Sequence, residues 1–405
     1  MKILFVIGNY LPTKNGGIEN YTHWLATLLM EKRFDVEIAT LHAKDNEDYV
    51  YQGIRVNYLK SGFNSFKNLL KSNQYYLCHF QEYSLFGGIE SFWFTEAKKY
   101  STKVFFTFHL PYLTCYKGDF RFKGIEDCDD FSSVERCVTC CIATKLHYKL
   151  TLKDNLKNLC IQLITPVILN SRRGVKLRKN IEGRKKELET LIASCDTIFI
   201  YGKWFKKLLD KNGYMSSSIK EISHITDINL ARNKDTQSGI KAKLIFVGRI
   251  EKQKGLYLLC KALRILNLLN IELDVYGNIV DANYYNRCEK EFRFNYMGSV
   301  PRRELINTFS RYDFLILPSI FTEMNSLVLR EALYEQLPVI VSDAKGNKDV
   351  IAEGLNGFLF EYANAKDLAA TIERAYKLKR EGWQPVFTYP ENPEKDIEEI
   401  VSYYR

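Results

Sequence analysis

The chain has 405 residues, which is more than one compact core usually holds, so we expect two domains of about 200 residues each. Its composition is globular, with 46% hydrophobic and 26% charged residues, and no apolar run approaches the roughly 20 residues of a membrane helix. These values exclude a membrane-spanning bundle and a low-complexity chain. One segment, residues 145–186, contains twelve Lys or Arg and two acids, and so carries the whole net charge of +10.

The first two hundred residues alternate apolar runs with helical stretches. The first run, KILFVIGNY (2–10), is followed by residues 18–29, whose apolar side chains recur at helical spacing. Such runs indicate a parallel sheet that is covered by helices on both faces. Because the chain begins with a strand rather than a leader peptide, we expect a cytoplasmic protein with reduced cysteines. The further predicted strands are 36–40, 54–59, 75–80, 103–110 and 197–202.

The alternation restarts after a polar stretch, ARNKDTQSG (231–239), which we interpret as a linker. The sequence therefore predicts a domain at 1–230, a second α/β domain at 231–385, and a helix within 386–405 that could pack back on the first domain. Open α/β sheets bind ligands beyond the carboxyl ends of their strands, so we expect a cleft between the domains to hold the site. The strands of the second domain are predicted at 243–250, 272–278, 294–300, 313–319 and 338–344, with a helix at 255–269.

Two loops that follow predicted strands could bind an anion. In NYLPTKNGGIENY (9–21), Gly16 and Gly17 let the backbone approach a ligand, and the next helix offers its positive N-terminus. In IFVGRIEKQKG (245–255), Arg249 and Lys254 lie between a strand and a helix, where two cations would neutralise a diphosphate. The alternatives are an ordinary glycine turn and two surface cations. Neither loop is a G-x-G-x-x-G fingerprint, which argues against a dinucleotide cofactor.

A third stretch, PSIFTEMNSLVLREAL (318–333), carries two glutamates, Glu323 and Glu331, that could bind hydroxyl groups. A carboxylate accepts hydrogen bonds from two hydroxyls, so the pair suits the diol of a ribose and the hydroxyls of a sugar. Two surface glutamates are the alternative. A helix is predicted to begin nearby and to present free backbone N–H groups at Asn325, Ser326 and Leu327.

Six motifs follow one another along the chain, and together they resemble a known family. They are NGGIENY, FFTFHLP, VGRIEKQKG, EMNSLVLRE, LPVIVSD and GLNGFLF. This set resembles the retaining family 4 glycosyltransferases of GT-B fold (glycosyl transferases group 1). The resemblance is strong over residues 243–377 and extends to 1–40 and 100–112. It implies an α/β chain with two Rossmann-like domains that face each other across a cleft.

The resemblance also implies catalytic roles for four residues. His109, at the end of its strand, would face the transferred sugar. Arg249 and Lys254 would hold the diphosphate leaving group, and Glu323 would bind the hydroxyls of the donor sugar. Catalysis in the family needs no metal or other cofactor, which agrees with two cations at the place where a metal would otherwise neutralise charge.

The same resemblance implies a hexose transfer from a nucleotide diphosphate sugar to a glycan or lipid-linked glycan, in bacterial polysaccharide biosynthesis. Gly16 and Gly17 would lie under the donor phosphates, and Glu331 would bind the ribose. The sugar would keep its anomeric configuration through attack on the face from which the diphosphate leaves. The alternatives are a sugar-nucleotide epimerase of the same fold and a basic, zinc-stapled RNA-binding protein. The two glutamates and two cations favour the transferase.

Four cysteines close to the histidine motif, Cys115, Cys128, Cys137 and Cys140, have a spacing that can complete a tetrahedral zinc site. Cys141 competes with Cys140, and buried thiols or a redox pair are alternatives. We predict a structural zinc in an insertion of about residues 112–145. Acidic residues between the cysteines argue against a nucleic-acid partner.

The basic segment, residues 145–186, could contact an anionic membrane. Lysines recur every four residues from Lys145 to Lys157, which predicts one basic helix face, and leucines can form another face. A basic amphipathic helix suits peripheral binding at the inner face of the cell membrane. A solvated helix face is the alternative.

Overall fold

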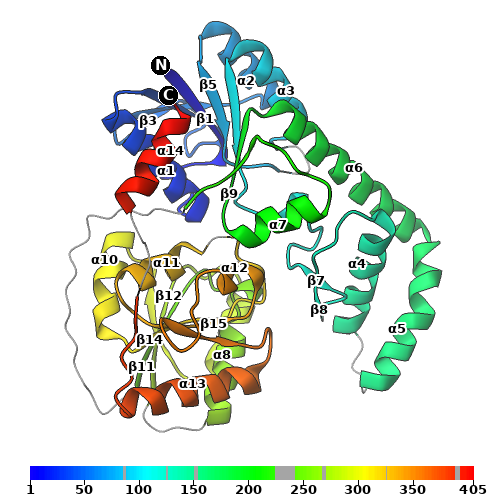
Figure 1. The fold of residues 1–405 in the computed structure, drawn as a ribbon, viewed down its shortest axis with the longest axis vertical. Coiled ribbons are helices and arrows are strands. Elements are labelled where there is room, and N and C mark those ends of the chain that lie inside the picture. Colours follow the sequence, from blue (N-terminus) through cyan, green and yellow to red (C-terminus); the bar gives the residue numbers. More distant parts are fainter. Residues whose placement is uncertain are drawn as a thin grey trace. The chain divides into compact units, whose positions relative to one another are not determined.

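The computed structural model describes residues 1–84, 88–124, 126–149, 154–223, 242–266, 271–324, 326–387 and 393–405. Two compact units are present (Figure 1). The N-terminal unit comprises Met1–Ser223 and Glu398–Arg405, and the C-terminal unit comprises His224–Ile397. The predicted linker, 231–239, lies outside the described residues.

The sheet of the N-terminal unit has the strand order β10-β9-β6-β5-β1-β2-β4-β3, and every described neighbour pair is parallel except β3 and β4. The first strand lies between β2 and β5, with Ile3 opposite both Val36 and Leu77. The strand order therefore reverses at β1, which makes its carboxyl end a switch point for ligand binding. The strands are β1 (Lys2–Asn9), β2 (Asp35–His42), β3 (Tyr49–Tyr51), β4 (Ile54–Tyr58), β5 (Leu77–Phe80), β6 (Lys103–Thr107), β9 (Thr197–Ile200) and β10 (Ile219–Glu221).

A long excursion of the chain connects β6 to β9. It begins with the short helix η1 (Pro111–Leu113) and a small hairpin of β7 (Arg121–Phe122) and β8 (Glu126–Asp127). Three helices then pack on one another, namely α4 (Val134–Lys149), α5 (Asp154–Leu169) and α6 (Arg172–Ser194) (Figure 1). The remaining helices of this unit's first segment are α1 (Gly17–Glu31), α2 (Phe63–Ser72), α3 (Ser91–Tyr100) and α7 (Lys203–Lys211).

The structure corrects the prediction of one basic helix face from Lys145 to Lys157. Lys145 and Lys149 belong to α4, whereas Lys157 belongs to α5, which packs against α4. Residues 150–153, including Lys153, lie outside the described part of the chain. The regular spacing of the lysines was misleading because this part of the sequence belongs to two helices that pack against each other, and not to one continuous helix.

The C-terminal unit has a parallel sheet with the order β13-β12-β11-β14-β15-β16. Here the order reverses between β11 and β14, so a second switch point lies at their carboxyl ends. The strands are β11 (Ala242–Val247), β12 (Ile271–Tyr276), β13 (Asn295–Gly298), β14 (Phe314–Leu317), β15 (Val339–Ser342) and β16 (Gly357–Phe360). The helices are η2 (Lys252–Lys254), α8 (Leu256–Leu266), α9 (Ala282–Glu291), α10 (Arg302–Thr308), η3 (Phe309–Arg311), α11 (Leu327–Tyr334), α12 (Lys345–Lys348) and α13 (Ala365–Arg380).

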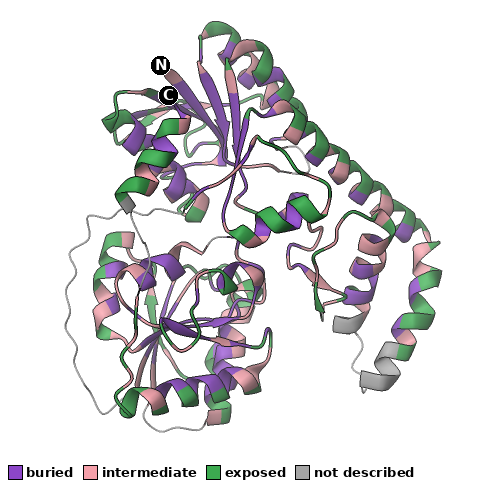
Figure 2. Cartoon of the chain, viewed as in Figure 1, coloured by how far each residue is buried: buried purple, intermediate pink, exposed green. Residues whose placement is uncertain are grey.

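Apolar side chains cover both faces of this second sheet. One cluster joins α8 and α13 to the strands through residues such as Leu259 and Ile372, and another joins α10 and α11 through Ile306 and Leu329. Figure 2 shows most strands of both sheets as buried, with the edge strands β3 and β13 as exceptions. Each strand that the apolar runs predicted is present, which confirms the α/β class with two Rossmann-like domains. The short strands β3, β7, β8, β10 and β16 were not predicted.

The last helix, α14 (Pro393–Tyr403), returns the chain to the N-terminal unit. Tyr404 is fully buried there, and its hydroxyl lies 2.6 Å from Nδ1 of His79 on β5. Among the described residues, no helix is long and apolar enough to cross a bilayer.

Candidate functional site

The loop after β11 and the loop after β14 meet at the switch point of the C-terminal unit. Gly255 ends η2 with φ +75°, and a Cβ atom there would lie 1.9 Å from the carbonyl oxygen of Pro318. Glycine is therefore required for the two loops to approach this closely. Gly346, at the start of α12, is equally constrained, because its Cβ would lie 1.7 Å from the carbonyl oxygen of Glu323.

Lys254 and Glu323 form an ion pair across these loops. The ammonium of Lys254 lies 2.6 Å from Oε1 of Glu323, and the hydroxyl of Ser319 donates to the same oxygen at 2.9 Å. The two charged side chains are only 25% and 14% exposed. A pair that is this well shielded is screened weakly by solvent, so it places a fixed positive charge beside a carboxylate at the switch point.

Arg249, the second predicted cation, is in a different environment. Its Nη2 atom lies 2.8 Å from Oε1 of Glu251 in the same loop, and its side chain is 56% exposed. A solvated arginine of this kind can move to a ligand at little cost, whereas Lys254 must exchange its contact with Glu323. The two predicted cations therefore share the loop after β11 but have different carboxylate partners.

Glu331 forms a buried ion pair that the sequence analysis did not predict. Its Oε1 accepts a hydrogen bond of 2.6 Å from Nε of Arg302 at the start of α10, and the glutamate side chain is 5% exposed. The α11 helix that carries Glu331 begins at Leu327, with Ser326 as its N-cap residue and no side-chain hydrogen bond at the cap. Asn325 lies outside the described residues.

His109 and Gln81 occupy the corresponding end of the N-terminal sheet, after β6 and β5. Nε2 of His109 lies 2.9 Å from Oε1 of Gln81, and because this amide oxygen can only accept, Nε2 carries the proton. Desolvation lowers the pKa of His109 to about 3, so the imidazole is neutral at physiological pH. Both residues line a small pocket together with Glu82 and Thr107. The Nε2 atom of Gln81 is buried without a hydrogen-bond partner in the described structure.

Two carboxylates lie near β1 and the loop after it, one from Glu82 after β5 and one from Glu19 in α1. Oε2 of Glu82 accepts the backbone N–H of Gly8 at 3.0 Å, and burial raises the pKa of Glu82. Glu19, in the first turn of α1, lies 2.9 Å from the ammonium of Lys14. A Cβ atom on Gly16 would lie 2.5 Å from Oε2 of Glu19, so this glycine makes room for that carboxylate.

The start of α1 therefore already faces negative charge. The helix begins at Gly17 with Gly16 as the N-cap residue, and Glu19 folds back over it. A phosphate at this point would compete with Glu19 for Lys14 and for the positive end of the helix. The role of Gly16 and Gly17 under the donor phosphates stays a prediction.

Four functional candidates escaped the sequence analysis. Ser319 follows β14 directly, and the position after a strand was a usable signal for it. The same signal was available for Gln81 and Glu82, which directly follow β5. Arg302 could not be found in this way, because its partner Glu331 is 29 residues away in sequence.

The four predicted zinc ligands, Cys115, Cys128, Cys137 and Cys140, all line one pocket of the excursion between β6 and β9. Among the described residues, no group of three or more His, Cys, Asp or Glu side chains is already arranged to coordinate an ion. All ten cysteines carry free thiols.

Comparison with known proteins identifies the C-terminal half of the chain. Residues 227–384 match the sequence model of a family described as "Glycosyl transferases group 1". An uncharacterized 41.2 kDa protein in the cps region of Klebsiella pneumoniae is 30% identical over 133 residues, which are 33% of this chain and 36% of that protein. A GDP-mannose-dependent α-mannosyltransferase of Corynebacterium glutamicum is 29% identical over 32% of this chain and 30% of its own length. These matches thus span about a third of each relative.

The fold is shared over the whole chain. The structure of HepE from Anabaena, in complex with UDP and glucose, superposes with a TM-score of 0.63 and 14% identity, covering 100% of this chain and 99% of that one. Residues 227–384 are therefore similar to the glycosyl transferases group 1 family, and the chain as a whole has the GT-B fold.

Proposed function

We propose that the protein is a retaining glycosyltransferase that moves a hexose from a nucleotide diphosphate sugar to a glycan or lipid-linked glycan. The observation that carries this proposal is the shielded pair of Lys254 and Glu323 at the switch point of the domain that matches the family. The HepE complex with UDP and glucose and the GDP-mannose-dependent relative support a nucleotide sugar donor. The relative in a cps region supports a role in polysaccharide biosynthesis.

In this proposal, cations of the C-terminal unit stabilise the leaving diphosphate without a metal. As the bond to the sugar breaks, negative charge develops on the diphosphate, and preorganised positive charge lowers the energy of that state. Lys254 supplies charge that Glu323 holds in place, and Arg249 reaches the phosphates from the solvent-exposed side of its loop. Glu323 then accepts hydroxyl hydrogen bonds from the sugar with the oxygen that Lys254 leaves free.

Glu331 binds the ribose in the proposed complex, and Arg302 orients it. Nε of Arg302 donates to Oε1 of Glu331, and Glu331 has a second oxygen to accept a hydroxyl. The backbone N–H groups of Ser326 and Leu327 at the start of α11 add a positive pole for the phosphates. Retention of configuration rests on the family resemblance alone.

His109 faces the transferred sugar as a neutral group. Its pKa of about 3 means that it does not act by gaining and losing a proton near neutral pH. It can hydrogen-bond a sugar hydroxyl, and Gln81 fixes its orientation through the 2.9 Å hydrogen bond. We therefore assign His109 a binding role and Gln81 a positioning role.

Donor binding tests the proposal directly. A panel of UDP and GDP sugars is added to the protein at saturation, and the melting temperature is measured. A bound donor stabilises the folded state by mass action, so at least one sugar should raise it. Glu323→Gln should abolish the shift, whereas Glu353→Gln, at an exposed ion pair of the same unit, should keep it. Absence of any shift with every sugar would contradict the proposal.

Product analysis separates transfer from epimerisation. With the donor that shifts the melting temperature, a transferase releases the nucleoside diphosphate and needs an acceptor, whereas an epimerase yields an isomeric nucleotide sugar with no acceptor. Nuclear magnetic resonance of the anomeric proton in the product distinguishes retention from inversion.

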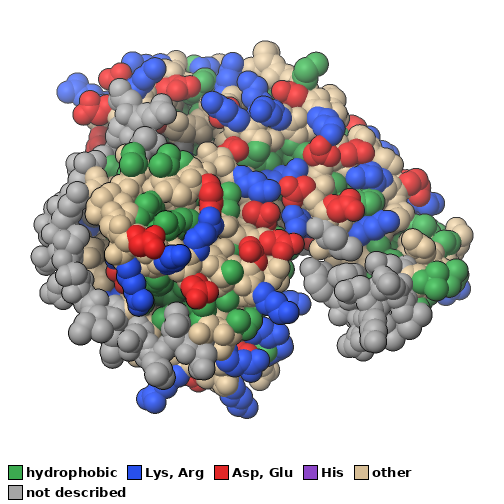
Figure 3. All heavy atoms as spheres, turned by 60° about the horizontal axis from the view of Figure 1, so that its bottom comes forward, with side chains coloured by type: hydrophobic (Ala, Val, Ile, Leu, Met, Phe, Trp, Pro, Cys, Tyr) green, Lys and Arg blue, Asp and Glu red, His purple; other side chains and the backbone are tan. Residues whose placement is uncertain are grey.

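We also propose that the acceptor is presented at an anionic membrane surface on the inner face of the cell membrane. Helix α5 exposes apolar side chains, with Leu163 67% and Val167 72% accessible. In Figure 3 green hydrophobic and blue basic side chains lie next to each other at this end of the N-terminal unit. Basic residues beside exposed apolar ones favour binding to anionic lipid.

A pocket of about 700 Å³ between α4, α5 and α6 supports this placement. Its lining combines apolar side chains such as Ile142 and Leu177 with Lys117, Lys145 and Arg173, and none of the described residues that line it is acidic. An apolar hollow with a basic rim fits the lipid and phosphate parts of a lipid-linked acceptor.

Vesicle sedimentation tests the membrane proposal. The protein should bind vesicles that contain phosphatidylglycerol and not vesicles of phosphatidylcholine alone, and added salt should release it. Val167→Glu should weaken binding, whereas Val50→Glu, at an equally exposed valine on β3, should not. Equal binding by both variants would contradict the assignment of this surface.

A further inference from the structure

We propose that Cys115, Cys128, Cys137 and Cys140 bind one structural zinc ion. The ion would connect the segment that contains Cys115, the β7–β8 hairpin and the first turns of α4. This inference goes beyond sugar transfer, because it concerns a metal that takes no part in the reaction.

The fold brings the four thiols together from three elements. Cys115 lies before the β7–β8 hairpin, Cys128 follows it, and Cys137 and Cys140 lie one turn apart on α4. All four line the same pocket.

Backbone hydrogen bonds hold the hairpin in a position that suits thiolate ligands. The N–H of Cys128 donates to the carbonyl oxygen of Phe120 at 2.6 Å and closes the base of the hairpin. The N–H of Lys123, in the hairpin turn, donates to Sγ of Cys140 at 3.1 Å. An N–H group that points at sulfur stabilises the thiolate more than the thiol, and such contacts orient metal ligands.

The metal-free thiols point to acceptors of their own. Sγ of Cys128 lies 3.4 Å from the carbonyl oxygen of Asp130, and Sγ of Cys115 lies 3.9 Å from Oδ1 of Asp119. This explains why no preformed metal group is present among the described residues. Zinc would release one proton from each of the four thiols and form four bonds of about 2.3 Å, so the side chains would turn from these acceptors to the ion.

The charged side chains around the pocket suit a zinc ion that is bound by four thiolates. Zinc with four thiolates carries two net negative charges, and Lys117, Arg121 and Arg136 all line the pocket. Each of them also pairs with an aspartate, namely Asp119, Asp127 or Asp130. Cations that aspartates hold at the edge of the pocket would stabilise the negative charge of the zinc–thiolate group and would still leave room for the ion.

Cys141 is the competing thiol, and its contacts separate it from Cys140. Cys141 also lines the pocket of the four thiols, but unlike Cys140 it lines the large pocket between α4 and α6 as well. Cys140 instead contacts the hairpin through Lys123 and through the carbonyl oxygen of Arg121. The geometry therefore assigns the fourth ligand to Cys140.

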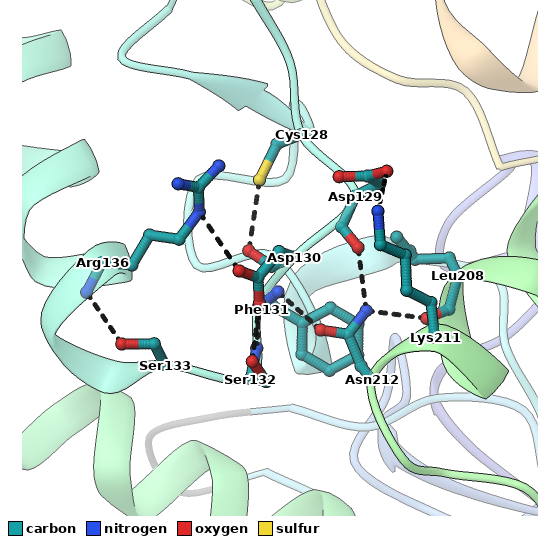
Figure 4. A network of polar contacts seen from close by, with 10 residues as sticks. All are labelled: Cys128, Asp129, Asp130, Phe131, Ser132, Ser133, Arg136, Leu208, Lys211 and Asn212. Atoms are coloured by element: carbon teal, nitrogen blue, oxygen red, sulfur yellow. Dashed lines mark hydrogen bonds and ion pairs between the residues drawn. The ribbon is translucent and has the colours of Figure 1, made fainter.

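The segment around Cys128 is anchored to α7 and the residue after it, as Figure 4 shows. Asp129 pairs with Lys211, and the side chain of Asn212 donates to the carbonyl oxygen of Asp129 at 3.0 Å. Oδ1 of Asn212 accepts the N–H of Phe131 at 2.7 Å. Because this segment is fixed to the sheet domain, a metal bound to Cys128 would fix α4 to that domain as well.

The metal would also shape the proposed acceptor pocket. Tyr116 and Lys117 directly follow Cys115 and line the cavity of about 700 Å³. A mobile Cys115 would leave that wall undefined, so loss of zinc should impair acceptor use more than donor binding. The expected effect on acceptor use rests on the proposed function, whereas the expected zinc content of the protein does not.

Metal analysis of the full-length protein tests the proposal. Plasma mass spectrometry should find one zinc per chain, and a mercurial reagent should release it from the wild type as thiols are modified, so no variant has to fold for this measurement. Cobalt added to metal-free protein should give the intense sulfur-to-cobalt absorption of tetrahedral thiolate ligation.

Serine variants test the ligand assignment. Cys128→Ser and Cys140→Ser should lose zinc, whereas Cys141→Ser and Cys160→Ser should keep it. Wild-type protein without zinc that also fails to bind cobalt would overturn the site, as would a disulfide among these cysteines in non-reducing peptide mapping. Retention of zinc by Cys140→Ser together with its loss from Cys141→Ser would overturn the choice of the fourth ligand.

Discussion

The polar groups at the two switch points differ in charge. In the C-terminal unit, Lys254 and Glu323 form a shielded ion pair. In the N-terminal unit, His109 and Gln81 form a hydrogen bond between neutral side chains, since desolvation lowers the pKa of His109 to about 3. Fixed charge suits a group whose own charge changes during reaction, whereas neutral donors and acceptors suit hydroxyls. This difference supports our proposal that the leaving group binds to the C-terminal unit and that His109 binds sugar hydroxyls.

The largest effect is expected from Lys254. Lys254→Ala should lower kcat by about 10³-fold, because it removes a shielded charge that is directed at the developing diphosphate, and Arg249→Ala by about 10²-fold. The exposed Arg249 is replaced more easily by water. Steady-state kinetics with saturating acceptor measures both. Arg374→Ala, at an exposed pair of the same unit, should change kcat little, and an equally small effect of Lys254→Ala would remove the basis of the comparison.

The second effect concerns stability and comes from Arg302. Arg302→Met should lower the free energy of unfolding of the C-terminal unit by about 3 kcal/mol, because it leaves the buried carboxylate of Glu331 without its partner. Urea denaturation followed by circular dichroism measures the change. Arg374→Met is the matched control, and it should cost less than about 1 kcal/mol because both partners are exposed. Similar costs for the two variants would show that the Arg302 pair is not shielded in solution.

A smaller effect on the free energy of unfolding is expected from Tyr404, which is buried in the N-terminal unit. Tyr404→Phe removes the hydroxyl that lies 2.6 Å from Nδ1 of the buried His79, and it should cost about 1–2 kcal/mol of unfolding free energy. Tyr403→Phe removes an exposed hydroxyl 3.4 Å from Glu399 and should cost almost nothing. The two tyrosines are neighbours, so the pair of variants controls for position in the chain.

The smallest effect is a change in how stability depends on pH. Burial lowers the pKa of both His79 and His109 below the ordinary value of 6.5, so between that value and their folded pKa the unfolded chain binds more protons. Their contribution to stability is therefore fully present above pH 6.5 and is lost as the pH falls toward the folded pKa. When urea denaturation is measured from pH 7 to pH 4, the free energy of unfolding of His109→Gln should fall less with decreasing pH than that of the wild type. An unchanged slope would mean that His109 is solvated and ionises normally.

The fold could be predicted largely from apolar runs, since strands that are buried on both faces are continuous in sequence, as β1 and β14 are. Short strands such as β3 were missed because Tyr49–Tyr51 carry little apolar signal, whereas the apolar edge strand β16 (Gly357–Phe360) was missed although its sequence is GFLF. The basic helix from Lys145 to Lys157 was wrong, because spacing cannot show where a chain folds back on itself.

Part of the site could be predicted from charged residues in the segments that follow predicted strands. Lys254 and Glu323 were found in this way, and the structure joins them at 2.6 Å. Arg302 was not found, because its partner, Glu331, is 29 residues away in sequence. Strand order decides which distant residues become neighbours, and that order is not written in any single segment.

The return of the last helix to the N-terminal unit has a consequence for biosynthesis. Residues 398–405 complete a unit whose other residues end at Ser223, and Tyr404 fills the space beside His79. At a translation rate of about 5–20 residues per second, this last piece leaves the ribosome on the order of 10–30 s after the rest of its unit. During that interval the nascent N-terminal unit exposes the aromatic surface around Phe5, Phe105 and Phe199 that Tyr404 later contacts. A chaperone that acts on the nascent chain would therefore find its target on the half of the protein that is made first.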